Sequence, residues 1–287
     1  MAPTPTQILT SSLMVAVRGL LFEQDSNGNG FGEPNFFKRQ QDTSSNDQQN
    51  TSIKSRLTPT KDQKITLGIA VGYFFAILIL WHIPYVKEIL KPFKLVTVAL
   101  HEFGHAITCL LTCGKVEGIE INPDEGGVTR MRGGVEWCTL PAGYLGSSLI
   151  GAVMVFAGFN ILASKIVSVF LAVCLVAILY WAGNWLTRIL TVLFVGLIIG
   201  LWFTPKGVGL KYFVLFMGVM SCMYSLWDII DDLVLRKVNS SDATRFAKKL
   251  HCSAHLCGVF WFLISAVFFA AAIILGIVAF KDDGSNS

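Results

Sequence analysis

The stretch Phe93–Cys113, FKLVTVALHEFGHAITCLLTC, decides the fold and the chemistry that we expect from this chain. It is long and apolar enough to cross a bilayer, which takes about 20 apolar residues. Its middle nevertheless carries His101, Glu102 and His105. An ionisable residue inside a membrane span costs about 2.5–3.5 kcal/mol on insertion scales. Three of them in one span therefore indicate a functional site.

These three residues have the spacing H-E-x-x-H. On a helix, His101 and His105 lie one turn apart on the same face, so both imidazoles can bind one metal ion. Glu102 is adjacent to His101, where its carboxylate can take a proton from a water on the metal. The pattern predicts one zinc ion with His101 and His105 as ligands and Glu102 as the catalytic acid/base.

The composition indicates a membrane protein along most of the chain. Of the 287 residues, 53% are hydrophobic and 15% are charged, whereas a soluble protein carries about 25% charged residues. The mean hydropathy is +0.58. The net charge of +4 comes from scattered basic residues with no basic stripe, so we expect no nucleic-acid partner. The seven cysteines contain no C-x-x-C pair and support neither a disulfide framework nor a cysteine zinc site.

The order of polar and apolar segments predicts three regions. Residues 1–63 include the polar stretch Gln24–Lys61, which predicts a flexible cytosolic tail. Residues 64–280 form the membrane domain, and residues 281–287 form a short tail. We predict an all-α polytopic membrane protein with about seven transmembrane helices, and six remain possible because the fourth and fifth spans are poorly separated. The spans are Ile65–Trp81, Phe93–Cys113, Thr139–Gly158, Lys165–Trp181, Ile189–Phe203, Tyr212–Leu235 and Cys257–Phe280.

The lysines and arginines of the loops predict the orientation. With seven spans, the N-terminal tail lies on the same side as the loops near 114–138, 182–188 and 236–256. That side carries most of the basic residues. We therefore expect the N-terminus and these loops in the cytosol, in an integral multi-pass protein of the endomembranes (ER or Golgi).

The loop Gly114–Cys138 predicts a small β-hairpin directly after the metal-motif helix. It combines short β-type runs with Asn-Pro-Asp and two Gly-Gly pairs. The hairpin can be an ordinary connection, or it can cover the site and present an edge to an extended peptide. In the second case, Gly126, Gly127 and Thr129 are the candidate substrate-binding residues. The next segment, Pro141–Ser148, is rich in small residues that favour close helix packing or leave room for the substrate.

Two histidines leave a catalytic zinc one protein ligand short of the usual three. The sixth span offers Asp228, Asp231 and Asp232, which share roughly one helical face. We predict Asp228, the deepest, as the third ligand. Asp231 and Asp232 are alternates, or they orient a histidine, or they are charges at a helix end. Asp242 falls in the first turn of a capped helix near 239–249, and we interpret it as a helix-start residue and not as a ligand.

With these residues in place, the chain resembles the peptidase M50B-like membrane proteins of fungi and plants, within the wider site-2-protease group. The resemblance implies zinc on His101 and His105, Glu102 as acid/base, and cleavage of membrane-protein substrates within or next to the bilayer. The better-studied site-2 proteases take a third ligand from an Asp-Gly pair in a later span, whereas the Asp-Gly of this chain lies in the C-terminal tail. The matching segments are His101–Ala106, Cys113–Gly118, Glu125–Thr129, Pro141–Ser148, Asp228–Asp232 and Ser241–Ala243.

We therefore expect an intramembrane zinc metalloendopeptidase of the site-2-protease type. One alternative is a catalytically silent pseudoprotease or chaperone of the same fold that holds membrane clients. Another is a metal or proton transporter that uses the buried histidines and aspartates. Transporters often consist of repeated halves, and the sequence contains no visible internal repeat.

Overall fold

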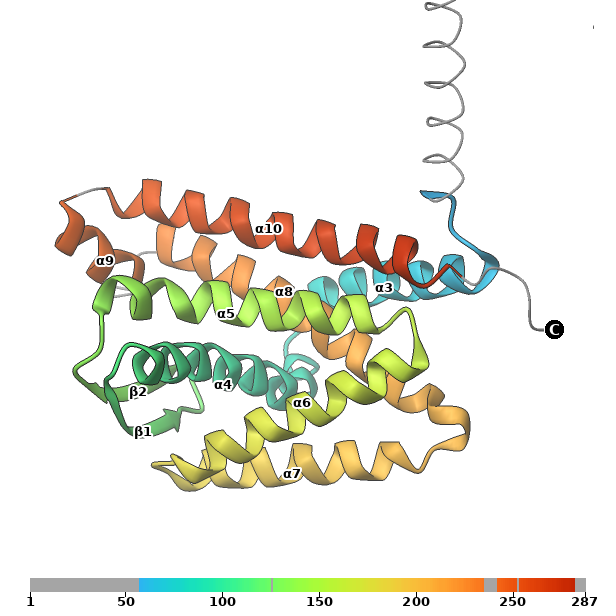
Figure 1. Cartoon of the computed structure of the whole chain (residues 1–287), viewed down its shortest axis with the longest axis horizontal. Coiled ribbons are helices and arrows are strands. Elements are labelled where there is room, and N and C mark those ends of the chain that lie inside the picture. Colours follow the sequence, from blue (N-terminus) through green and yellow to red (C-terminus); the bar gives the residue numbers. More distant parts are fainter. Residues whose placement is uncertain (1–56, 125, 235–241, 252, 282–287) are drawn as a thin grey trace, which may run out of the picture. The chain divides into compact units, whose positions relative to one another are not determined.

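The computed structural model describes residues 57–124, 126–234, 242–251 and 253–281. All of them belong to one compact unit, Arg56–Ser287. The predicted tail over residues 1–63 lies outside the described residues up to residue 56. Figure 1 shows a bundle of helices with a small hairpin and a short helix at one end.

The described residues form eight α-helices, one short 3₁₀ helix (Pro205–Gly207) and one two-stranded sheet. The predicted hydrophobic runs are all helical, and most of the helices begin a few residues earlier than the apolar run. Polar side chains at their starts explain this, because Thr60 forms a capping box with Gln63 and Asn160 and Asn184 cap the helices that follow them. The helices are α3 (Lys61–Leu80), α4 (Lys87–Leu111), α5 (Glu136–Ala157), α6 (Ile161–Tyr180), α7 (Trp185–Trp202), α8 (Val208–Val234), α9 (Asp242–Leu250) and α10 (Ala254–Ala279).

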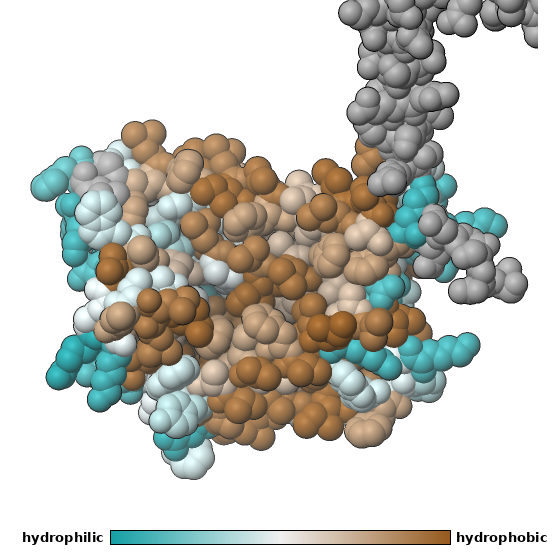
Figure 2. All heavy atoms as spheres, viewed as in Figure 1, coloured by the Kyte–Doolittle hydropathy of each residue, from teal (hydrophilic) through white to brown (hydrophobic). Residues whose placement is uncertain are grey.

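Six of the described helices are long and apolar enough to cross a membrane, namely α3, α5, α6, α7, α8 and α10. The protein is therefore an all-α polytopic membrane protein with a small hairpin. Figure 2 shows hydrophobic residues across the middle of one face and hydrophilic residues toward its two ends.

The long helix α4 is the exception, because Lys94, His101, Glu102 and His105 lower the hydropathy of its apolar part and it is not among the candidate spans. Every residue of α4 from Lys94 to Ala106 is buried. Protein surrounds this part of α4, with α5, α8 and the hairpin in contact with it. Its ionisable side chains are thus shielded from lipid by neighbouring helices, which is how membrane proteins accommodate such groups.

The predicted hairpin is confirmed as β1 (Lys115–Ile121) and β2 (Gly127–Arg132), which pair antiparallel with Ile119 opposite Thr129. The outer edge of β1 is also occupied. Ile119 accepts a backbone hydrogen bond from Gly183 and donates one to Trp181, in the turn between α6 and α7. Of the two strands, β2 is therefore the one whose outer edge faces away from this turn.

Small side chains bring α5 against its neighbours, as the composition of Pro141–Ser148 predicts. The hydroxyl groups of Ser147 and Ser225 on α8 are 2.8 Å apart, and Ser148 donates to Ser265 on α10 at 2.7 Å. These contacts place α5 in the middle of the bundle, between α4 and the α8–α10 pair.

The start of α3 lies at the end of the bundle opposite the hairpin. The side chain of Gln63 donates to the carbonyl of Ile277 near the end of α10, and Lys211 near the start of α8 donates to Thr66. In Figure 1, α3 runs from this end toward the centre, and α4 continues from the centre to the hairpin. The two helices therefore run in the same direction and do not form an up-and-down pair.

This arrangement corrects the predicted topology for the described residues. Lys64, whose charge we counted on the same side as the hairpin, lies at the opposite end. The reason is that hydropathy measures how apolar a segment is but not whether the next segment reverses direction.

Candidate metal centre

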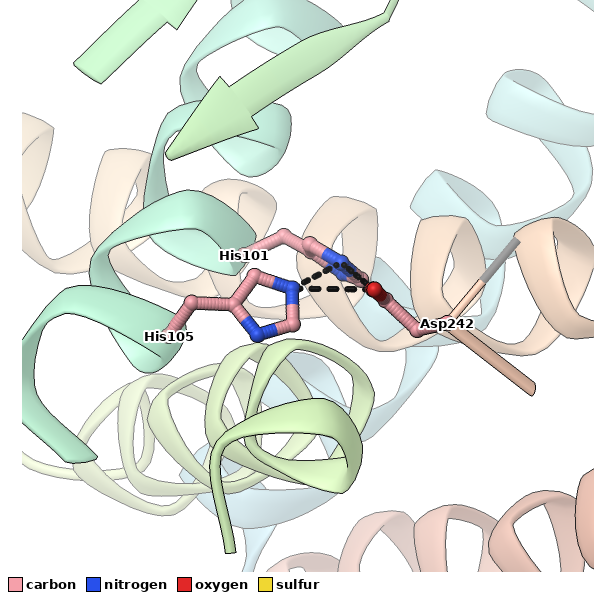
Figure 3. Close-up of side chains that lie close together, drawn as sticks. All are labelled: His101, His105 and Asp242. Atoms are coloured by element: carbon pink, nitrogen blue, oxygen red, sulfur yellow. Dashed lines mark hydrogen bonds and ion pairs between the residues drawn. The ribbon is translucent and has the colours of Figure 1, made fainter. Parts of the chain in front are cut away.

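Two histidines of α4 face each other on the side that packs against α5. The Nε2 atoms of His101 and His105 are 3.1 Å apart, and both side chains are buried. Figure 3 shows the two rings projecting from neighbouring turns toward one point. The spacing of four residues thus produces the shared face that the sequence predicts.

The third member of the group is Asp242, the first residue of α9. Its Oδ2 atom lies 3.3 Å from Nε2 of His101 and 2.9 Å from Nε2 of His105 (Figure 3). Burial raises the pKa of the Asp242 carboxyl, but the two neighbouring histidines outweigh this effect and hold the pKa well below its usual range. Asp242 is therefore an ionised carboxylate directed at both imidazoles.

A small apolar cluster holds α9 in this position. Ala243 of α9 is buried together with Tyr144 of α5, Ile229 of α8 and Trp261 of α10. The ring of Phe246 packs on Trp261 with the ring centroids 5.1 Å apart. At the far end of α9, Lys249 forms an ion pair with Glu136 at the start of α5. These contacts tie α9 to three helices of the bundle.

The structure brings Asp242, and not the predicted third ligand Asp228, to the two histidines. Among the described residues, the group of donors that can hold one metal ion is His101, His105 and Asp242, and Asp228 is not part of it. The side chains of Asp231 and Asp232 lie outside the described residues. We interpreted Asp242 as a helix-start residue because Asp is common in the first turn. It does occupy the first turn, and from there its side chain also reaches the histidines.

The sequence contained a weak signal for Asp242. The segment Ser241–Ala243 was among those that matched the family, yet the same residues also fitted a helix start. A helix-start interpretation and a ligand role do not exclude each other. What sequence reasoning missed is that α9 packs on α5 and α10 with Asp242 beside the histidines of α4.

The three donor atoms are spaced as zinc ligands would be. Zinc–nitrogen bonds of about 2.0–2.1 Å in a tetrahedron place two ligand atoms about 3.3 Å apart. The observed separations of 3.1, 3.3 and 2.9 Å are close to this value. Gly143 of α5 faces the pair, and a Cβ atom there would overlap the Nε2 atoms of both histidines. Because α5 has no side chain at this position, it leaves space for an ion beside the two Nε2 atoms.

The second ring nitrogens differ between the two histidines. Nδ1 of His105 donates to the carbonyl of Thr139 at 2.6 Å, which leaves its Nε2 lone pair free for a metal. Nδ1 of His101 is buried and makes no hydrogen bond with the residues that the structure describes. The ring of Tyr144 meets the His101 ring edge to face, with the centroids 4.8 Å apart, and this contact orients it instead.

Glu102 is buried beside this group, against the hairpin. The hydroxyl of Thr129 on β2 donates to Oε2 of Glu102 at 2.6 Å and lies 3.0 Å from the Glu102 backbone carbonyl oxygen. Gly127 packs directly on the carboxylate, and a Cβ atom there would overlap it. Two of the three residues that we predicted to bind substrate therefore contact the predicted catalytic base.

Comparison with known proteins supports the membrane-peptidase interpretation. The family model described as Peptidase M50B-like matches residues 70–272. This range includes α4, the hairpin, α5 and α9, and hence every residue of the candidate site. No curated protein and no solved structure matches the chain.

Proposed function

This chain belongs to the peptidase M50B-like family, and from this premise we propose that it is a zinc metalloendopeptidase that hydrolyses peptide bonds in or next to the membrane. The observation that carries the proposal is the convergence of His101, His105 and Asp242 on one point, with Glu102 buried beside them. Ionisable groups are costly to bury, and this set combines a complete zinc ligand group with a separate acid/base.

The proposed division of roles follows from the contacts of each side chain. His101, His105 and Asp242 would hold the zinc ion. When bound, the ion supplies Lewis acidity, which polarises a carbonyl and makes a water a good nucleophile near neutral pH. The hydrogen bond from His105 to Thr139 fixes which of its ring nitrogens faces the ion.

Glu102 would act as the general base and then as the general acid. Thr129 donates to Oε2, so Oε1 is the oxygen that takes a proton from the attacking water. The same oxygen then returns the proton to the leaving amine. The hydroxyl of Thr129 restricts the rotation of the carboxylate, and Oε1, which lies against Gly127, is the oxygen left for proton transfer.

The hairpin is the element that would present the substrate. The turn between α6 and α7 pairs with the outer edge of β1, which leaves the outer edge of β2 for an added strand. Gly127 lies at the start of this edge and packs on Glu102, and Gly126 directly precedes it in the chain. A peptide that binds here is extended, and its carbonyls are accessible, whereas an intact helix keeps them in internal hydrogen bonds. The proposed substrate is therefore a membrane-protein segment that unwinds locally.

The test is proteolysis by purified full-length protein in liposomes that contain a panel of single-span membrane peptides. New peptide termini are measured by mass spectrometry for the wild type, Glu102→Gln and the control Glu117→Gln. Glu117 is an exposed β1 residue that pairs with Arg132. Loss of the general base lowers the rate by about 10²–10⁴-fold. We expect this loss for Glu102→Gln and an unchanged rate for Glu117→Gln.

Products that form equally fast with Glu102→Gln would overturn the proposal. One equivalent of bound zinc without any Glu102-dependent product would favour the alternative, a catalytically silent binding protein of the same fold. Metal that is released across sealed liposomes would favour transport.

A further inference from the structure

A groove runs along the outer face of the bundle between α6 and α7, away from the metal centre. It has a volume of about 390 Å³ and extends over two turns of α6, about 10 Å. Figure 2 shows a largely hydrophobic surface over these two helices, along the lower edge of the view. The residues that line the groove are all apolar: Val169, Ala172, Val173, Val176, Ile198, Ile199, Trp202 and Phe203.

A lysine stands at one end of this groove. Lys165 precedes Val169 by one turn of α6, and its Nζ atom lies 5.9 Å from the centre of the Trp202 ring. The turn before α8 packs against the same side chain, since a Cβ atom at Gly207 would lie 2.9 Å from Cε of Lys165. Lys206 is the neighbouring residue in that turn and is exposed. Two cations are therefore close to the point where the apolar groove ends.

The positive charges of Lys165 and Lys206 have no acidic residue near them in the sequence. The sequence contains no Asp or Glu between Glu136 and Asp228. Lys165 and Lys206 form no ion pair with any residue that the structure describes. An external anion at this position would be stabilised by the two lysines, with no carboxylate nearby in the sequence to oppose them.

We propose that the groove binds one acyl chain of an anionic glycerophospholipid whose phosphate group contacts Lys165. The apolar lining suits a hydrocarbon chain, and the lysine pair suits a phosphate that carries net negative charge. A zwitterionic lipid is the weaker ligand because its own ammonium group offsets the attraction. A free phosphate ion would contact the lysines but gain nothing from the groove.

The experiment measures lipid retention by native mass spectrometry on the full chain, released from nanodiscs with equal amounts of phosphatidylserine and phosphatidylcholine. We expect one retained phosphatidylserine per wild-type chain. One lysine contributes about 1 kcal/mol to such binding, so Lys165→Ala lowers the retention about fivefold. The matched control is Lys64→Ala, an exposed lysine at the same end of the bundle that has no place in the groove, and it leaves the retention unchanged.

A second variant tests the groove itself. Val173→Trp fills it, so the retention of phosphatidylserine falls, while circular dichroism and the thermal unfolding midpoint show that the fold is intact. Equal retention of the two lipids by the wild type would overturn the proposal, as would an equal loss with Lys64→Ala, which indicates general surface charge. Displacement by inorganic phosphate would indicate a phosphate site. Dimers that disappear with Val173→Trp would show that a second copy fills the groove.

Discussion

Asp242 meets two conditions that a metal ligand has to meet. Its carboxyl stays ionised because two histidines lower its pKa against the effect of burial. Its position is restrained because Ala243, the next residue, is buried in the cluster around Trp261. Asp228 on α8 is outside the group of donors.

Asp242→Asn is therefore expected to lose zinc, and Asp228→Asn to keep it. Changes around a zinc ligand typically cost about 10–100-fold in affinity, and removal of the ligand itself exceeds this. The measurement is zinc content and affinity of the purified variants by mass spectrometry and chelator competition. If Asp228→Asn lost the metal while Asp242→Asn retained it, the assignment would have to be reversed.

Thr129 positions the carboxylate of Glu102, the proposed general base, through a hydrogen bond to Oε2. A hydrogen bond to a charged group contributes about 1.5–3 kcal/mol, which corresponds to roughly 10–100-fold in rate. We expect Thr129→Val to lower kcat/KM of proteolysis by this factor with unchanged zinc content. Thr129→Ser keeps the hydroxyl and is the matched control, so its kcat/KM stays near the wild-type value. Equal losses in the two variants would indicate that the methyl group matters, and not the hydrogen bond.

Among the elements, the contact between α4 and α5 controls the space at the site. Gly143 of α5 lies beside both histidines, at a distance that excludes any side chain. The small residues of the following turn then lock α5 against α8 and α10 through serine hydroxyl groups. Contacts with α8 and α10 thus hold α5 in place, so it cannot move away from α4 to accommodate a larger side chain at Gly143.

Gly143→Ala is accordingly expected to reduce zinc affinity at least tenfold and to lower thermal stability, since an added methyl group in a tight core costs about 1–3 kcal/mol. The matched control is Gly196→Ala in α7, where an added Cβ atom meets nothing within 4 Å. Zinc titration and the midpoint of thermal unfolding are measured for both variants. A Gly143→Ala protein that binds zinc normally would show that α5 can move away.

Helix α9 carries one residue of the candidate site, although the helix is too polar to span the bilayer. Its nine residues attach to the bundle by apolar contacts near its start and by the ion pair between Lys249 and Glu136 near its end. The position of Asp242 relative to the two histidines therefore depends on how α9 packs against the bundle. The site is therefore assembled from α4 and α9, with α5 as the surface between them.

Across the whole molecule, the start of α3 and the hairpin lie at opposite ends of the bundle. We predict that cysteines at Lys64 and Arg132 react with a membrane-impermeant maleimide from opposite faces of sealed vesicles. The background lacks the exposed native Cys113 and Cys138. A cysteine at Lys248 on α9 is the control and reacts from the same face as Arg132. Labelling of all three positions from one face would contradict this topology.

Much of the fold and half of the site were predictable from the sequence because they depend on local properties. Each hydrophobic run is long enough to become a helix, and the Asn-Pro-Asp and Gly-Gly turns indicate the hairpin. His101 and His105 share a face through helix geometry alone. The identity of the third donor was not predictable, because Asp228 and Asp242 both lie near the end of the same membrane passage.

The sequence by itself determined that the protein is a helical membrane protein with two histidines and a glutamate at its centre, because transfer free energy and helical spacing are properties of neighbouring residues. The tertiary structure alone decided that Asp242 completes the group and that Thr129 holds Glu102. It also decided that α3 and α4 run in the same direction. These outcomes depend on contacts between residues far apart in the chain, such as the 141 positions that separate His101 from Asp242, and no local pattern encodes them.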